Sequence, residues 1–123
     1  KLNLGKINST LTRMIIWHDM NEQVRDGKLK VADFMAIFNA HIYDEIDDKI
    51  FEFEYTFVRD ALNNYISKTQ RDSLKELVFT KTYEQLIPAT DTPNRIIMLK
   101  EYLPTFAVTN NHINILEDWR TNN

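Results

Sequence analysis

The sequence contains no cysteine, only two glycines and only three prolines among its 123 residues. Without cysteine the chain can form no disulfide, no thiolate metal site and no cysteine nucleophile. A β-sandwich or barrel needs a tight turn about every ten residues, which so few turn formers cannot supply. No apolar run is long enough to span a bilayer. Two isolated glycines cannot build a phosphate-cradling loop either. The sequence therefore favours a helical protein, and no motif in it names an enzymatic reaction or a cofactor.

The composition is that of an ordinary globular protein. A hydrophobic content of 43% supplies a core, and a charged fraction of 27% supplies a solvated surface. The net charge is −3 and the basic residues are scattered, so we expect neither a nucleic-acid nor a membrane partner. The lack of cysteine fits a cytoplasmic location, although the first residue, Lys1, leaves targeting by an upstream segment open. Abundant asparagine is typical of an AT-rich source such as a phage or a low-GC bacterium.

Two helices are predicted in the first part of the chain. The first covers about residues 9–25, with Asn8, Ser9 or Thr10 as its cap and Gly27 in a left-handed position after its end. Its apolar side chains recur at helical spacing and form the expected core face: Leu11, Met14, Ile15 and His18, widened by Ile16, Met20 and Val24. The second helix covers about residues 31–44 and carries a stripe of Phe34, Ile37, Phe38 and Ile42.

Residues 47–66 allow two interpretations. As a helix, this segment has an apolar arc of about 220°, and Glu54 falls near the middle of that arc. As a strand at 49–57, its aromatic residues alternate with Glu52, Glu54 and Thr56, which would leave Glu54 in water. A strand needs a partner, and no tight-turn signal joins this segment to a candidate. The helix is preferred.

Three more helices are predicted in the second part, at about residues 70–79, at 93–103 and from Thr109 or Asn110 onward. Thr92 and Pro93 have the pattern of a cap followed by proline at the first helical position. The chain is therefore predicted to be a mostly α single domain over residues 1–123, an irregular bundle of five or six helices. The alternative is an α+β fold with a short strand at 49–57.

A partner-binding surface is predicted where an acidic run meets the central aromatic residues. An apolar arc this wide indicates either a central helix of the bundle or a helix that also contacts a partner. For the second case, the expected surface has aromatic anchors with an acidic rim: Tyr43, Phe51 and Tyr55, with Asp44, Asp47 and Asp48. The acidic rim indicates a basic partner.

Metal binding is the alternative function. His18 precedes Glu22, and His41 precedes Glu45, by one helical turn, so each pair shares a helix face. Residues 26–34 also resemble the second half of an EF-hand calcium loop, which implies calcium ligands before and after Gly27. Val24 falls at an expected ligand position and cannot coordinate, so a helix end at Gly27 is preferred. We predict a protein–protein interaction module, an adaptor, inhibitor or assembly subunit that binds a partner or self-associates.

Overall fold

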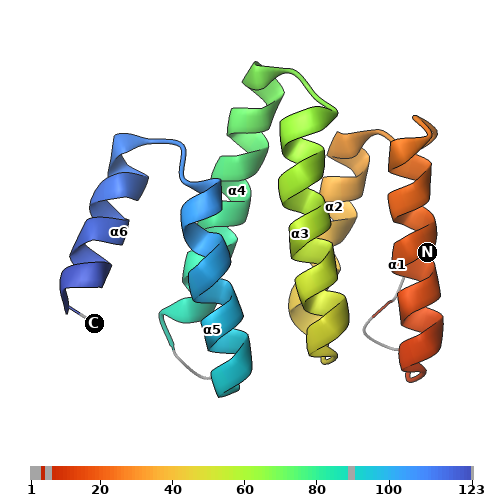
Figure 1. Ribbon diagram of the computed structural model, residues 1–123, viewed down its shortest axis with the longest axis horizontal. Coiled ribbons are helices and arrows are strands. Elements are labelled where there is room, and N and C mark those ends of the chain that lie inside the picture. Colours follow the sequence, from red (N-terminus) through yellow and green to blue (C-terminus); the bar gives the residue numbers. More distant parts are fainter. Residues whose placement is uncertain (1–3, 5–6, 89–90, 123) are drawn as a thin grey trace. The chain divides into compact units, whose positions relative to one another are not determined.

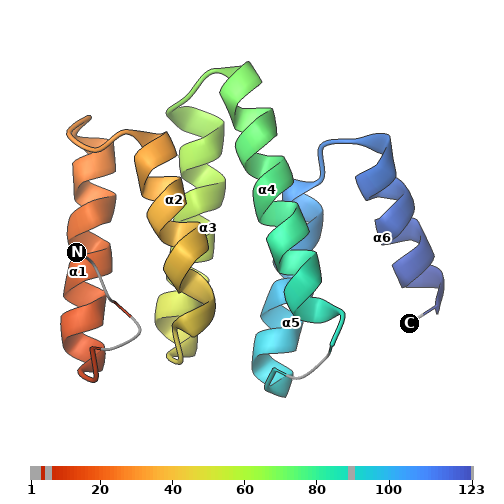
Figure 2. The same ribbon diagram turned by 180° about the vertical axis from the view of Figure 1, so that it is seen from behind.

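The computed structural model describes residue 4 and residues 7–88 and 91–122. Over these residues the chain forms six α-helices, joined by short connections that include 3₁₀ turns, and no strand (Figures 1 and 2). The elements are α1 (Thr10–Arg25), α2 (Val31–His41), η2 (Ile42–Asp44), α3 (Asp48–Asn64), α4 (Lys68–Leu86), α5 (Pro93–Tyr102), η3 (Leu103–Phe106) and α6 (Asn110–Asn122). The mostly α prediction is confirmed. The alternative strand at 49–57 is wrong, because these residues lie inside α3.

The helices fall into two compact units, Lys1–Ile66 with α1 to α3 and Ser67–Asn123 with α4 to α6. In the first unit all three helices pack against one another, and both views show them standing side by side (Figures 1 and 2). The single domain over residues 1–123 stays a prediction. None of the helices in the described ranges has the length and apolar character needed to cross a membrane.

Local capping determines where most helices begin and end. Ser9 accepts a hydrogen bond from the Thr12 amide at 3.2 Å, and Thr92 accepts one from the Arg95 amide at 3.3 Å. Gly27, with φ of 74°, ends α1 in the left-handed region as predicted. The prediction for residues 70–79 was too short, because Ser67 caps α4 and the helix continues to Leu86.

The core of the first unit is aromatic and is centred on α3. Its buried rings come from all three helices and meet mostly edge to face, as aromatic pairs prefer. The Phe38 and Tyr55 centroids are 5.2 Å apart, and those of Phe34 and Phe57 are 5.5 Å apart. Phe53 points the other way and is half exposed. Burial along α3 therefore follows the helical period, which explains why the alternating aromatic pattern does not form a strand.

The central stripe of the expected core face of α1 is wrong, although Met20 and Val24 at its edge are buried as predicted. Leu11, Met14 and Ile15 are 60%, 48% and 57% exposed, and His18 is exposed as well. The buried residues of α1 are centred on a different part of the helix from the expected stripe and include two polar ones: Arg13, Trp17, Met20, Asn21 and Val24. Arg13 and Asn21 are buried because each has a carboxylate partner elsewhere in the unit. Their partners lie far away in the sequence, so an apolar pattern along α1 alone points to the wrong face.

The second unit has its own core. The rings of Phe79 on α4 and His112 on α6 stack with centroids 4.0 Å apart. Tyr83 contacts Trp119 edge to face at 6.4 Å, which is a second contact between α4 and α6. Leu99, Leu103 and Phe106 are fully buried around them.

Candidate functional site

An apolar groove lies between α1 and α3 in the first unit. It contains a cavity of about 370 Å³, near the lower limit of typical small-ligand pockets. The walls of this α1–α3 groove are formed by side chains of both helices: Met14, Trp17, His18, Ile50, Phe53 and Glu54. Thr10, Asp47 and Lys49 complete the lining. A hollow of this kind can receive an apolar group that also offers one polar contact.

Glu54 is a buried acidic residue in the lining of this groove. Its side chain is buried, with the residue only 2% exposed, and Oε2 accepts a hydrogen bond from Asn21 Nδ2 at 2.8 Å. The second oxygen, Oε1, has no hydrogen-bond partner among the described residues. Burial raises the pKa of Glu54 to about 7, although the Asn21 hydrogen bond and the Arg25 charge both act to lower it. At neutral pH the carboxyl is therefore close to its titration midpoint.

Two neighbouring buried groups also lack partners within the described part of the chain. Trp17 packs its ring against Phe34 and Phe38, and its indole Nε1 donates to no acceptor. Asn21 Oδ1, on the residue that holds Glu54, accepts from no donor. Buried polar atoms in folded proteins are nearly always hydrogen-bonded, so each such atom needs an explanation. A bound molecule that supplies hydrogen bonds to these atoms is one such explanation.

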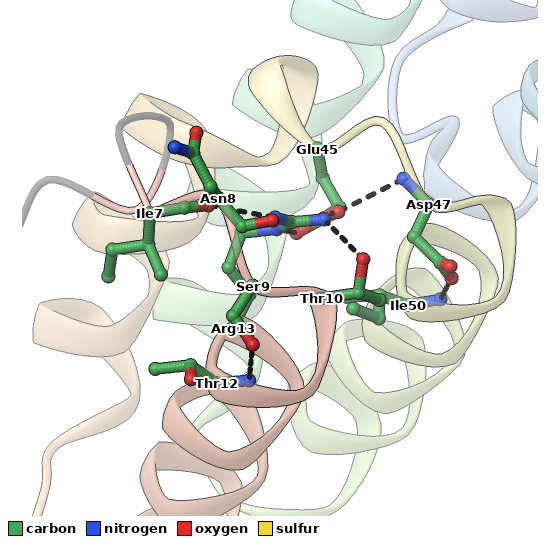
Figure 3. Close-up of polar contacts among 9 residues, drawn as sticks. All are labelled: Ile7, Asn8, Ser9, Thr10, Thr12, Arg13, Glu45, Asp47 and Ile50. Carbon is green, nitrogen blue, oxygen red and sulfur yellow. Dashed lines mark hydrogen bonds and ion pairs between the residues drawn. The ribbon is translucent and has the colours of Figure 1, made fainter.

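A buried ion pair connects the start of α1 to the segment before α3 (Figure 3). Arg13 Nε donates to both carboxylate oxygens of Glu45, at 3.0 and 3.2 Å. The other guanidinium nitrogens donate to the Ile7 and Asn8 carbonyls at 2.8 and 3.2 Å and to the Thr10 hydroxyl at 3.3 Å. All of these acceptors converge on one planar cation, so the geometry is well defined.

The same carboxylate continues the network to α3. Glu45 Oε2 accepts from the Asp47 amide at 3.0 Å, and Asp47 Oδ1 caps α3 by accepting from the Ile50 amide at 2.9 Å (Figure 3). The first turns of α1 and α3 are thus tied together through Arg13 and Glu45. These turns contribute Thr10, Asp47 and Ile50 to the groove, so the ion pair acts as a structural brace for this end of it.

The groove continues onto an exposed apolar surface. Leu11, Met14 and Ile15 form a stripe on the solvent face of α1, and Phe53 on α3 is 50% exposed. A second hollow on α1 is lined by Met14, Ile15 and His18 together with Asp19 and Glu22. A contiguous apolar surface with polar edges is typical of an interaction site.

The predicted partner-binding residues divide between core and surface. Phe51 and Tyr55 are completely buried, so the structure does not support them as exposed anchors. They pack in the aromatic core of α3, with centroids 4.8 Å apart. Tyr43 is partly buried, and its hydroxyl contacts that of Tyr55 at 2.6 Å.

The acidic members of that prediction remain near the surface. Asp44 is exposed, and Asp47 and Asp48 are partly buried at the start of α3. Of the six predicted residues, only Asp47 lines the α1–α3 groove.

Two of the four predicted metal ligands are engaged by arginine side chains. Glu45 is held by Arg13, and Glu22 forms an ion pair with Arg25. His18 is exposed on α1, and His41 is the last residue of α2. In the described residues, no group of three histidine or acidic side chains is placed to hold a metal ion.

The loop that resembles an EF-hand half is the end of a helix. Gly27 N donates to the Val24 carbonyl at 3.1 Å, and Lys28 N donates to the Gln23 carbonyl at 2.8 Å. These bonds satisfy the last carbonyl groups of α1, as expected for a glycine C-cap.

The groove residues could have been identified only in part from the sequence. The position of Glu54 within the apolar arc of residues 47–66 is the available signal for a buried carboxyl. Nothing local indicates that Trp17 and Asn21 lie beside it. The chain matches no protein-family model, and no curated protein or solved structure is significantly similar to it.

Proposed function

We propose that this protein is a small helical interaction module that binds a basic amphipathic helix of a partner protein in the α1–α3 groove. The observation that carries the proposal is the exposed apolar stripe of Leu11, Met14 and Ile15 beside an apolar cavity. Amphipathic helices commonly bind by laying their apolar face into such a groove. We keep the predicted interaction role, but we propose that the binding surface is formed by α1 and Phe53 and not by the buried Phe51 and Tyr55.

The charges around the groove favour a basic partner. Asp19 lies beside the stripe and Asp47 lies at the groove, where Lys49 is the only lysine or arginine in the lining of the described cavity; Glu22, also beside the stripe, is paired with Arg25. Opposite charges at the rim of an interface select partners and accelerate their encounter. A second copy of this chain would bring the same acidic rim, so we commit to a different protein whose helix carries lysine or arginine beside its apolar face.

The test is a selection from a displayed library of helical peptides, using the whole chain as bait. Ile15→Glu is the disrupting variant and Ile97→Glu is its matched control, because both isoleucines are 57% exposed and Ile97 lies in the other unit. We expect enriched peptides with apolar residues at helical spacing and flanking basic residues. Their affinity should fall about tenfold or more with Ile15→Glu and stay unchanged with Ile97→Glu.

Two results would overturn the proposal. One is an enriched peptide set that binds wild type and Ile15→Glu equally well. The other is a solution mass that doubles with concentration in wild type but not in Ile15→Glu, which would make this surface a contact between copies. Circular dichroism of both variants confirms that they remain folded.

A further inference from the structure

The lining of the α1–α3 groove contains a carboxyl group with one unpaired oxygen. Glu54 lines the cavity, and its buried Oε1 has no hydrogen-bond partner among the described residues; the one unpaired buried donor in the described lining is Trp17 Nε1. An ionised carboxylate is an acceptor only, whereas an ammonium group offers three donors. Because the ionised carboxylate is also negatively charged, a cationic donor group complements Glu54 in both charge and hydrogen bonding.

The apolar lining of the groove determines which cationic side chain fits into it. Met14, Ile50 and Phe53 line the same cavity as Glu54. A lysine side chain has an apolar four-carbon stem and a compact charged end, so the stem can contact these apolar side chains while the ammonium group contacts Glu54. Arginine is a poorer match, because its planar fork has five donors for the single unpaired oxygen of Glu54.

Resting on the proposed function, we infer that the α1–α3 groove receives a lysine side chain of the partner helix, whose ammonium group hydrogen-bonds to Oε1 of Glu54. Charge-assisted hydrogen bonds of this type are shorter and stronger than neutral ones. The contact would also satisfy a buried oxygen that otherwise lacks a partner. Glu54 is then the specificity-determining residue of the groove.

Several charged groups surround the site and must be accounted for. On α1 these are His18, which lines the cavity, and Arg25, whose charge acts on Glu54. At the start of α3 they are Asp47 and Lys49. Among its described residues α2 contributes none to the lining. Because a proton and an ammonium ion compete for the same carboxylate, binding of the ammonium should strengthen as the pH rises through 7.

The test uses n-hexylammonium chloride as a mimic of the lysine side chain and n-hexanol as its neutral counterpart. Binding to the whole chain is followed by NMR, with the Trp17 indole N–H as reporter, at pH 6 and pH 8. With a pKa of about 7, the ammonium should bind about tenfold more weakly at pH 6. Glu54→Gln should remove both this pH dependence and the preference over hexanol. Glu52→Gln, the same change on the exposed side of α3, should preserve both.

His18→Gln serves as a second control, because it removes the imidazole that lines the cavity. The inference is overturned if hexanol binds as well as hexylammonium, if neither binds, or if the pH dependence is lost with His18→Gln and kept with Glu54→Gln. These results leave the proposed function intact, since the peptide selection tests Ile15 and not Glu54. Selected peptides that need Ile15 but contain no required lysine would support the module and remove the lysine contact.

Discussion

The side-chain amide of Asn21 on α1 donates a hydrogen bond of 2.8 Å to Oε2 of Glu54 on α3. This bond places a carboxyl group in the interior of the first unit and leaves Oε1 without a partner in the described residues. The arrangement stabilises the charged form only partly, because burial is the largest influence on this pKa and raises it.

The stability of the chain should therefore fall between pH 5 and pH 8 because of Glu54. The pKa rises from 4.5 to about 7 on folding, so the folded chain binds this proton more tightly. The favourable contribution is complete below pH 4.5 and is lost as the pH rises through 7, for a total of about 3 kcal/mol. Urea unfolding of wild type and Glu54→Gln at pH 5 and at pH 8 measures this loss of stability. Equal pH dependence in the two proteins would show that Glu54 titrates normally.

Breaking the brace between α1 and the start of α3 should be strongly destabilising. Arg13→Met leaves the Glu45 carboxylate buried without its cation, which typically costs 3–5 kcal/mol, here about 3 kcal/mol. Arg59→Met removes an arginine from the solvent-exposed pair with Asp60 in the same unit and should change little. Denaturant midpoints of both variants give the comparison. An Arg13→Met protein as stable as Arg59→Met would mean that the ion pair does not hold these helices together.

Replacing phenylalanine at two positions of α3 should give very different losses of stability. Phe51 is completely buried, so Phe51→Ala should cost about 3–5 kcal/mol and can prevent folding. Phe53 is half exposed in the groove, so Phe53→Ala should cost about 1 kcal/mol or less. The two residues would share a face in a strand, and equal losses of stability from the two substitutions would contradict the helix.

Gly27→Ala should destabilise the first unit by about 1 kcal/mol, because alanine is strained at a φ of 74°. A Cβ at this position would meet no atom within 4 Å, so the effect comes from the backbone alone. Gly27→Asn should cost less, since asparagine tolerates the left-handed region better. Thermal unfolding of the two variants checks both the size and the order of these effects.

The sequence predicts the helices well because their signals are local. Ser9, Gly27 and the Thr92-Pro93 pair each act within one turn of the helix end that they define. The buried face of α1 is not predictable in this way. Arg13 and Asn21 are buried only because Glu45 and Glu54 lie opposite them, 32 and 33 residues further along the chain. The exposed stripe at Leu11, Met14 and Ile15 has the same helical spacing as a core face, so spacing alone does not distinguish the two.

The interaction surface is partly predictable for a related reason. The apolar arc of α3 is too wide for one neighbouring helix to cover. It therefore indicates, correctly, that α3 is central to its unit. It does not reveal which aromatic ring remains outside, since Phe51 and Phe53 differ only in their register relative to α1 and α2. That register is fixed by packing between helices, which no single segment encodes.

The chain has two tryptophans, and Trp17 lies in the first compact unit while Trp119 lies in the second. Each unit therefore carries its own intrinsic fluorophore. Replacing one or the other with phenylalanine yields two single-emitter proteins whose melting curves can be superimposed. Coincident curves would mean that both halves unfold cooperatively as one, and separated curves would assign a distinct transition to each half.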